Sequence, residues 1–503
     1  MKRIAVLLIL AAAVYAFTGC KTGAPASFHP NNKYSAQVLQ NELSLLQNIL
    51  EANHPSLYWY TPKDSLDAYF ALTHASLQDS LTEKEFRNKV AWVISKIRCG
   101  HTAVRHSKQY SKHFSRNQSP LFPLSVKIWP DSAVIIGNLN RQDSVLRRGT
   151  IITAINNYPI QRIIDSMFSL MSTDGYSDNF KYQVISFNFP AYYKNTFGLD
   201  SQYIIHYVDS SGRRNHKVLN NFYPKKDTTA LPLVVAPYKV SRRDRIRMSR
   251  LSKRNLRIDT ALNTAVLSVN TFSEGRLPSF FRKSFRRIRK MKIENVVLDL
   301  RQNSGGSVLA STKLTQYLVD KPFKVADTVA AINRRLTYRQ HIQPWFLYWL
   351  SMHLTGKKMN DGRIHFRYFE RHHYKPKRRN HFDGNIYVVA GGYTFSAATL
   401  VTGFLKGQQN VTVVGEETGG GAYGNSAMHL PVIILPATRL RVSLPLYRIV
   451  LNSDLPKNGR GIFPDVEVPP SSTAIQKGVD AKMEKVRELI QGSSKANEIL
   501  RSP

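Results

Sequence analysis

The sequence predicts an α/β core whose helices cover a largely parallel sheet, preceded by a helical segment and a β-rich segment. After residue 260, short β-branched runs alternate with helical stretches, which is the order of elements in a parallel sheet. Residues 34–98 carry apolar side chains at helical spacing. From Leu121 the spacing changes to the two-residue alternation of strands.

The N-terminus has the pattern of a secretory signal over residues 1–19. Two basic residues precede an apolar run from Ile4 to Phe17, and Thr18-Gly19-Cys20 follow. The run is too short for a comfortable membrane span. A cysteine directly after Thr-Gly resembles the bacterial lipoprotein signal, which implies a lipidated Cys20, a polar tether over 20–32 and an outer-membrane-anchored protein of the cell envelope. The alternative is ordinary secretion, with Cys20 as a small residue near the cleavage site.

Cysteine usage agrees with an exported chain that depends on its hydrophobic core. If Cys20 is acylated, Cys99 has no partner for an intrachain disulfide. His, Cys and Asp residues show no spacing typical of a zinc site. We therefore expect neither a metal nor another cofactor.

The chain is strongly basic, with a formal net charge of +37 over 503 residues. Residues 241–290 are one of its densest stretches, with acidic residues only at Asp244, Asp259 and Glu274. Such a field favours anionic partners such as acidic peptides, lipid head groups or polyanionic glycans, although a solvated basic surface is the simpler interpretation. No nucleic-acid-binding signature is present, so nucleic acid is not an expected partner.

Composition and periodicity divide the rest of the chain. The predicted parts are a helical N-terminal domain over 33–115, a basic linker over 226–257, the α/β core over 258–470 and a helical tail over 471–503. In the helical N-terminal domain, a predicted helix ends at Cys99-Gly100, directly before His101. Inside the core, the basic and aromatic insertion 320–380 is interpreted as either a lid or a membrane-facing element.

The β-rich segment spans 118–225. Its run from Val145 to Ile160 resembles the PDZ pattern, in which a glycine turn leads to a strand, a two-residue turn and a short apolar return. The resemblance implies a groove that takes an extended peptide C-terminus as an added strand. The alternative is a small β-rich domain without a peptide groove.

The most informative stretch lies around Ser396. A β-branched run ends in Gly391-Gly392, and Ser396 follows at the start of a predicted helix. Free backbone N–H groups and the positive end of the helix dipole favour a developing negative charge there. A nucleophilic serine needs that setting together with a base and an oxyanion hole. The alternative is that Ser396 only caps the helix.

Four motifs resemble those of the tail-specific (C-terminal processing) serine proteases and of the tricorn core protease. In chain order they are Leu298–Gly306, Thr394–Ala398, Val414–Gly421 and Gly461–Val468. The resemblance implies the crotonase-like α/β fold of that family, with Ser396 as the nucleophile. It also implies an oxyanion hole of backbone N–H groups, one from Ala397 and the other from Gly305 or Gly306.

One departure from that pattern points to the base. The processing proteases use a Ser-Lys dyad, but Gly421 occupies the lysine's place here. The tricorn-like branch instead uses a histidine in a Gly-His-Thr motif, which His101 matches, and imidazole titrates near neutral pH. The alternative is a histidine that only caps the preceding helix. A third residue should orient the imidazole, and Asp454 and Asn458 are equal candidates.

The sequence therefore predicts an exported serine endopeptidase that hydrolyses peptide bonds of envelope or extracellular proteins. Protein or peptide substrates, recognised in part through their C-termini, are the expected partners. The first alternative is a non-catalytic ligand- or peptide-binding protein on the same fold, as in the interphotoreceptor retinoid-binding protein family. The second is an envelope structural protein that uses its basic surface.

Overall fold

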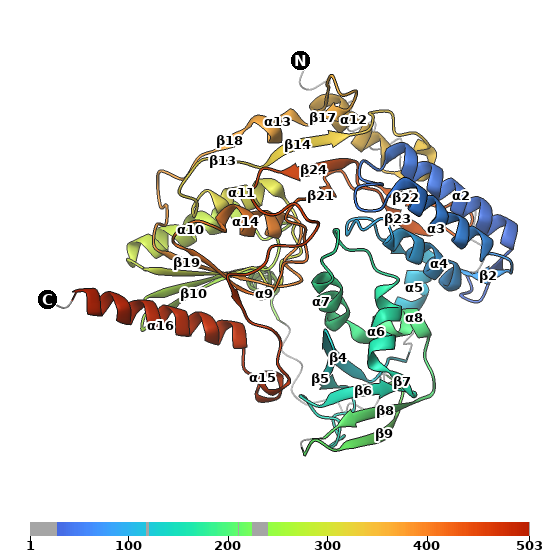
Figure 1. Ribbon diagram of the computed structural model, residues 1–503, viewed down its shortest axis with the longest axis horizontal. Coiled ribbons are helices and arrows are strands. Elements are labelled where there is room, and N and C mark those ends of the chain that lie inside the picture. The colour runs from blue at the N-terminus through green and yellow to red at the C-terminus, as the bar shows by residue number, and fades with distance from the viewer. Residues whose placement is uncertain (1–27, 117–119, 210, 224–239, 502–503) are drawn as a thin grey trace.

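The computed structural model describes residues 28–116, 120–209, 211–223 and 240–501 (Figure 1). The predicted signal segment 1–19 and Cys20 lie outside these residues. Within the described ranges, no helix has both the length and the apolarity needed to cross a membrane.

A six-stranded sheet forms the centre of the α/β core. In spatial order its strands are β10 (Arg254–Asp259), β11 (Thr264–Val269), β12 (Asn295–Asp299), β19 (Asn385–Ala390), β20 (Val411–Gly415) and β25 (Val466–Glu467). All neighbours pair in parallel except β10, which runs antiparallel to β11. The predicted α/β core with a largely parallel sheet is confirmed.

Helices cover both faces of this sheet. One face packs against α10 (Leu277–Lys290), α11 (Val308–Thr315) and α14 (Ala397–Leu405), and the other packs against α16 (Ala481–Arg501), which follows the short α15 (Ser472–Lys477). On α10, Phe281, Phe285 and Ile288 are at most 1% exposed, as the helical spacing predicts. Because β12 and β19 are parallel, the loops after them meet at one edge of the sheet, where α/β proteins commonly place their sites.

The N-terminal helices share a second hydrophobic core with later parts of the chain. These helices are α2 (Ala36–Asn53), α3 (Lys63–Ala75), α4 (Glu83–Ser95) and α5 (Lys108–Arg116), and β1 (Lys33–Tyr34) pairs with β2 (Leu81–Thr82) between them. Apolar side chains of α2, α3 and α4 pack against residues between 325 and 451. The helical segment therefore buries its apolar faces against distant strands rather than in a core of its own.

Two sheets supply those strands. The first has the order β16 (Lys357–Lys358), β17 (Ile364–His365), β14 (Ala326–Ala331), β24 (Tyr447–Leu451) and β21 (Gly424–Ala427). The second has the order β15 (Ile342–Gln343), β22 (Val432–Ile434), β23 (Arg441–Ser443) and β3 (Val104–Arg105). Since β14 is the central strand of the first sheet, the insertion 320–380 is in large part a structural element of the core rather than a lid.

The remaining elements of that insertion surround the second core. They are β13 (Phe323–Lys324), η1 (Arg339–His341), α12 (Trp345–Thr355), α13 (Arg367–Arg371) and β18 (His373–Tyr374), which pairs with β13. Helix α12 turns Tyr348 and Trp349 toward the core and leaves Leu347 and Leu354 exposed.

The segment 118–225 contains a separate β-rich unit with its own core. Its strands are β4 (Leu124–Trp129), β5 (Ser132–Asn138), β6 (Ile151–Ile155), β7 (Tyr158–Pro159), β8 (Gln202–Val208) and β9 (Arg214–Asn220), and its helices are α6 (Ile160–Phe168), α7 (Asn179–Phe187) and α8 (Phe189–Phe197). The edge strand β4 is covered by α7, where the Ser186 hydroxyl accepts the Ile128 N–H at 2.8 Å.

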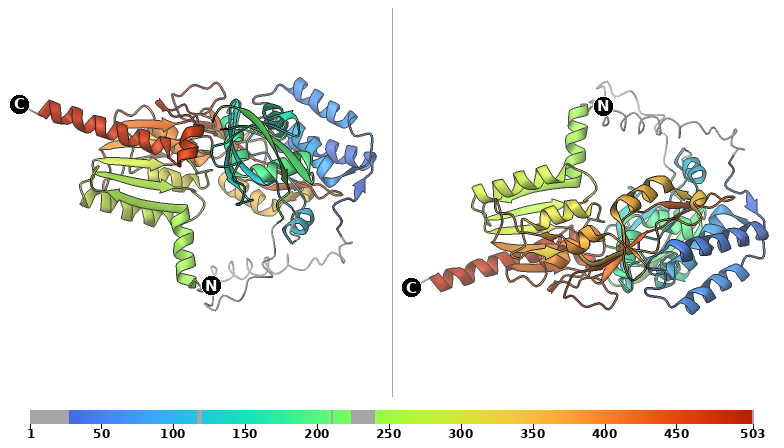
Figure 2. Two further views of the ribbon diagram at one scale, coloured as in Figure 1. Left: turned by 90° about the horizontal axis from the view of Figure 1, so that it is seen from below. Right: turned by 90° about the horizontal axis from the view of Figure 1, so that it is seen from above.

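The prediction of a linker over 226–257 is wrong for its second half. Residues 242–253 form α9 (Arg242–Lys253), and the chain continues directly into the core strand β10. Ser241 caps the helix, since its hydroxyl accepts the Asp244 N–H at 3.0 Å. Helix α9 projects away from the rest of the molecule (Figure 2) and has no buried residue. Its density of arginine made this helix look like a solvated connection.

Candidate active site

Ser396 lies on a strained turn between β19 and α14. Its backbone has φ 53° and ψ −121°, which is unusual for a residue with a side chain. The turn is held on both sides: the Phe395 N–H donates to the Asn303 carbonyl at 3.0 Å, and the Ser396 carbonyl accepts from Leu400 at 3.1 Å. The surrounding structure therefore imposes a conformation that sets Ser396 at the N-terminus of α14.

The glycine loop after β12 packs directly against this serine. Gly305 has φ +104°, and a Cβ added there would lie 2.7 Å from the Cβ of Ser396. The buried Asn303 fixes the loop, since its amide nitrogen donates to Val269 at 2.9 Å and its side-chain oxygen accepts the Gly305 N–H at 2.8 Å. Only glycine permits this close approach.

The same contacts distinguish the two glycines that were predicted to supply an oxyanion N–H. The Gly305 N–H is already bonded to Asn303. Among the hydrogen bonds of the described residues, none has the N–H of Gly306 or Ala397 as its donor, and Gly306 lines the cavity at Ser396. Of the predicted oxyanion donors, Ala397 and Gly306, and not Gly305, therefore have an N–H group that is free to bind an oxyanion.

His101 lines the same cavity as Ser396, although the two residues are 295 positions apart in the sequence. The imidazole lies beside the Phe395 ring, with 4.9 Å between ring centres. Gly100 fits against that ring so closely that a Cβ there would lie 2.6 Å from it. The residue that precedes the nucleophile thus holds the histidine loop in place.

Behind His101 lies an acid that the sequence analysis missed. Asp174 Oδ1 is 3.7 Å from His101 Nδ1 and accepts the Gly100 N–H at 2.8 Å. Both side chains are nearly buried, with 3% of Asp174 and 9% of His101 exposed. Within the described chain, His101 Nδ1 and Asp174 Oδ2 have no hydrogen-bond partner. Such pairs commonly tighten when substrate binds, so Asp174 is placed to orient the imidazole.

The two predicted candidates for this role lie elsewhere. Asp454 is exposed, and Asn458 is an exposed residue whose side chain accepts the Arg460 N–H at 3.0 Å. Their loop supports the site indirectly, because the neighbouring Gly459 carbonyl accepts the Tyr176 N–H at 2.8 Å. It therefore helps to hold the turn that carries Asp174. In the sequence, Asp174-Gly175 is typical of an ordinary turn within the β-rich segment, so nothing there indicates a functional acid.

Ser396, His101 and Gly306 open into one cavity of about 500 Å³. Apart from them, mostly apolar side chains line it, including Val308, Leu309, Tyr348, Phe369, Met428 and Leu430. Neither a lysine nor an acid is among its lining residues. A cavity of this kind suits an apolar side chain next to the reacting bond.

The cavity contains a second histidine that the sequence analysis did not identify. His429 has a positive φ of 49°, and its Nε2 lies 2.6 Å from the Ser351 hydroxyl. Burial lowers its pKa, which keeps the ring neutral near pH 7. Of the acids in the described residues, none is hydrogen-bonded to His429, so His101 is better equipped to act as a base.

A thiol also lies near His101. Cys99, His101 and Asp174 place candidate ligand atoms within 4.8 Å of one another, which is the geometry of a potential metal site. Burial, together with the nearby Asp174, raises the pKa of Cys99 to about 12. A thiol must lose its proton to bind a metal or to act as a nucleophile. Near neutral pH the free Cys99 thiol therefore keeps its proton and is poorly suited to act as a nucleophile.

The comparisons with known proteins agree with this geometry. Residues 263–468 match the model of peptidase family S41, and no curated protein matches the chain. Mature CPAF superimposes with a TM-score of 0.62 at 14% identity, over 90% of this chain and 96% of that one. Mature CPAF complexed with lactacystin gives a TM-score of 0.62 at 14% identity, over 92% and 98% of the two chains.

At this level of identity the solved structures establish a shared fold, which extends beyond the core to the N-terminal and β-rich parts. The family model covers the segment that contains the glycine loop and Ser396, and not the segment of His101. Together with the motifs described above, the family match identifies residues 263–468 as the core of a serine-type peptidase of family S41, the family of the tail-specific proteases.

Proposed function

We propose that the protein is an exported serine endopeptidase that uses a Ser396–His101–Asp174 triad. One observation carries this proposal: Ser396, His101 and Gly306 line a single cavity, and Asp174 lies directly behind the imidazole. A lysine base, as in the processing proteases, has no counterpart among the residues of that cavity.

In the proposed mechanism, each residue has its own step. Ser396 Oγ attacks the peptide carbonyl carbon while its proton passes to His101 Nε2, since Nδ1 is turned toward Asp174. The N–H groups of Ala397 and Gly306 stabilise the oxyanion of the tetrahedral intermediate. His101 then gives the proton to the leaving amine, and water hydrolyses the acyl-enzyme by the same route.

A fluorophosphonate probe tests this assignment, because it reacts with an activated serine and not with a scaffold serine. The wild-type protein should be labelled, whereas Ser396→Ala and His101→Ala should not. Ser304→Ala and His429→Gln are matched controls, since both residues line the same cavity, and both variants should retain labelling. Labelling that is absent from the wild type would favour the binding-protein alternative.

Peptide hydrolysis provides the second readout. Ser396→Ala and His101→Ala should each lose several orders of magnitude in kcat, and the double variant should be little worse than either, because the residues act as a unit. Mature CPAF forms a complex with lactacystin, which makes lactacystin a reasonable inhibitor to try. Full activity of His101→Ala would contradict the proposed base.

We further infer an envelope location from the N-terminal sequence. Lipidation of Cys20 would tether the chain to a membrane, and stable anchoring needs more than one acyl chain. Cys20→Ser should therefore release the protein into the aqueous phase of a detergent partition. Unchanged membrane association of this variant would assign the anchoring to another part of the chain.

A further inference from the structure

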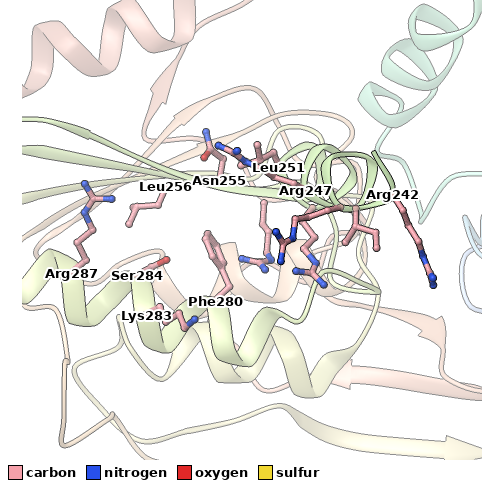
Figure 3. A pocket seen from close by; sticks show the side chains of 13 residues that line it. Arg242, Arg247, Leu251, Asn255, Leu256, Phe280, Lys283, Ser284 and Arg287 are labelled. Atoms are coloured by element: carbon pink, nitrogen blue, oxygen red, sulfur yellow. The ribbon is translucent and has the colours of Figure 1, made fainter. Parts of the chain in front are cut away.

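A large basic groove lies at the edge of the core sheet, outside the catalytic cavity. It has a volume of about 840 Å³ and is bounded by α9, β10 and α10 (Figure 3). Seven of its lining residues are Arg or Lys, and none is acidic. Leu256 and Phe280 contribute apolar side chains between those charges.

Among the described residues, no acidic side chain forms an ion pair with a cation of the groove. Burial and the adjacent Arg250 lower the pKa of the Arg254 guanidinium, and Arg254 stacks on the Phe280 ring at 4.3 Å. Among the acids closest in sequence, the Asp244 carboxylate accepts the Ser241 hydroxyl at 2.7 Å, and Glu274 pairs with Lys253. Uncompensated arginines at this density favour a ligand with several carboxylate or phosphate groups.

The groove begins close to the catalytic loops. Because β10 runs antiparallel to β11, Arg254 pairs with Val269 at the end of the sheet that carries the active-site loops. The loop after β11 connects the two sites: Phe272 bridges to the glycine loop, with its N–H donated to Gly305 at 2.8 Å, and Gly275 accepts a hydrogen bond from Arg254. The loop after β11 therefore contacts both the glycine loop of the cavity and an arginine of the groove.

The groove also has an unpaired strand edge. β10 is the first strand of the sheet, with a strand neighbour on one side only within the described residues, and its Asn255 and Leu256 line the groove. An extended polypeptide can form main-chain hydrogen bonds with such an edge while its side chains reach the neighbouring cations.

The lining disfavours the other anionic partners. Ile246 and Leu251 of α9 lie in the groove among arginines, so the helix lacks the separate apolar face that inserts into a lipid surface. Nucleic-acid strands bind by stacking bases on free aromatic rings, whereas Phe280, the aromatic residue of the lining, is covered by Arg254.

We propose that this groove is an exosite that binds an acidic segment of the polypeptide substrate during cleavage. The inference rests on the peptidase function proposed above and narrows its substrates to chains with an acidic stretch next to the cleaved bond. Binding there raises the local concentration and the association rate of such substrates.

The test compares matched substrates. A short fluorogenic peptide that fills only the cavity is extended with a tract of Glu or, as a control, a tract of Gln, on either the N-terminal or the C-terminal side. In one of the two directions, the Glu tract should raise kcat/KM about tenfold over the Gln tract at low salt. Half-molar salt should remove most of this advantage.

Two charge-reversal variants localise the effect. Arg247→Glu combined with Arg250→Glu should abolish the advantage of the Glu tract and leave cleavage of the short peptide within twofold of wild type. Lys357→Glu with Lys358→Glu makes the same change of charge on β16, which belongs to a different sheet, and should keep the advantage. Equal cleavage of Glu- and Gln-extended peptides in both directions would overturn the proposal.

Binding without cleavage separates this proposal from the catalytic one. Fluorescence anisotropy of the Glu-extended peptide on Ser396→Ala should show binding that Arg247→Glu with Arg250→Glu removes, whether or not the serine is catalytic. Vesicles of anionic phospholipid serve as the competing probe. Groove-dependent vesicle binding without groove-dependent peptide binding would assign the surface to lipid and overturn the exosite.

Discussion

Asp174→Asn tests the one residue of the proposed triad that was found from the structure and not from the sequence. The substitution removes one negative charge and keeps a side-chain oxygen that can still accept the Gly100 N–H, which Asp174 now accepts at 2.8 Å. The loop should therefore keep its shape. The change acts on the imidazolium that forms when His101 takes the serine proton.

The magnitude follows from the geometry. At the 3.7 Å that separates His101 Nδ1 from Asp174 Oδ1, a unit charge pair is worth about 4 kcal/mol with an effective dielectric constant of about 20. A barrier raised by that amount slows the reaction about a thousandfold. Because the interaction develops in the transition state, the loss should appear in kcat with little change in KM.

Steady-state hydrolysis of a peptide substrate, with the melting temperature measured alongside, checks this expectation. Asp454→Asn and Asn458→Ala are the matched controls, because the sequence favoured these residues and the structure leaves both exposed. The two controls should stay within about threefold of wild type, well below the effect of a buried charge. The reasoning fails if Asp174→Asn keeps more than a tenth of the activity, or if Asp454→Asn loses as much.

Three further predictions concern stability and recognition. Burial lowers the pKa of His54 to about 3, so on acidification the unfolded chain takes up a proton near pH 6.5, before the folded chain does. The free energy of unfolding is therefore at its full value above that pH and should fall by about 2 kcal/mol by pH 5. Urea titration should find a smaller loss in His54→Gln. Gly305→Ala would place a Cβ 2.7 Å from the Cβ of Ser396 and should abolish fluorophosphonate labelling, whereas Gly362→Ala, with a similar φ and open space around it, should retain labelling. If the β-rich unit takes substrate C-termini as an added strand, amidated peptides should be cut more slowly than free ones in the same assay, and equal rates would rule out such a groove.

Sequence reasoning located those parts of the candidate site that depend on neighbouring residues. The strand, the glycine turn and Ser396 form one local motif, and the glycines of the 305–306 loop belong to another. Even there, the sequence left open which glycine N–H is free, because the answer depends on the side chain of Asn303.

The misses have a common physical cause in contacts between distant parts of the chain. Asp174 meets His101 across 73 residues, and no periodicity records such a pairing. Strand β14 pairs with β24 from more than a hundred residues away. Without that pairing, the insertion 320–380 was interpreted as a lid or a membrane-facing element. Helix α9 has no buried residue, and its polar composition concealed the helix.

In the proposed triad, the position of Asp174 makes hydrolysis depend on the assembly of two units. Ser396 belongs to the core, whereas Asp174 belongs to the β-rich unit, whose apolar interior is separate. Both polar and aromatic contacts join them. The Ser177 hydroxyl donates to the Thr418 carbonyl at 2.6 Å, the Asn179 amide donates to the Glu417 carbonyl at 2.7 Å, and the Phe180 ring stacks on Phe395 with 4.5 Å between ring centres. When these contacts break, the core keeps the nucleophile Ser396, but Asp174 no longer lies behind His101. Neither unit alone contains the complete proposed triad, so full peptidase activity requires that the two units be docked.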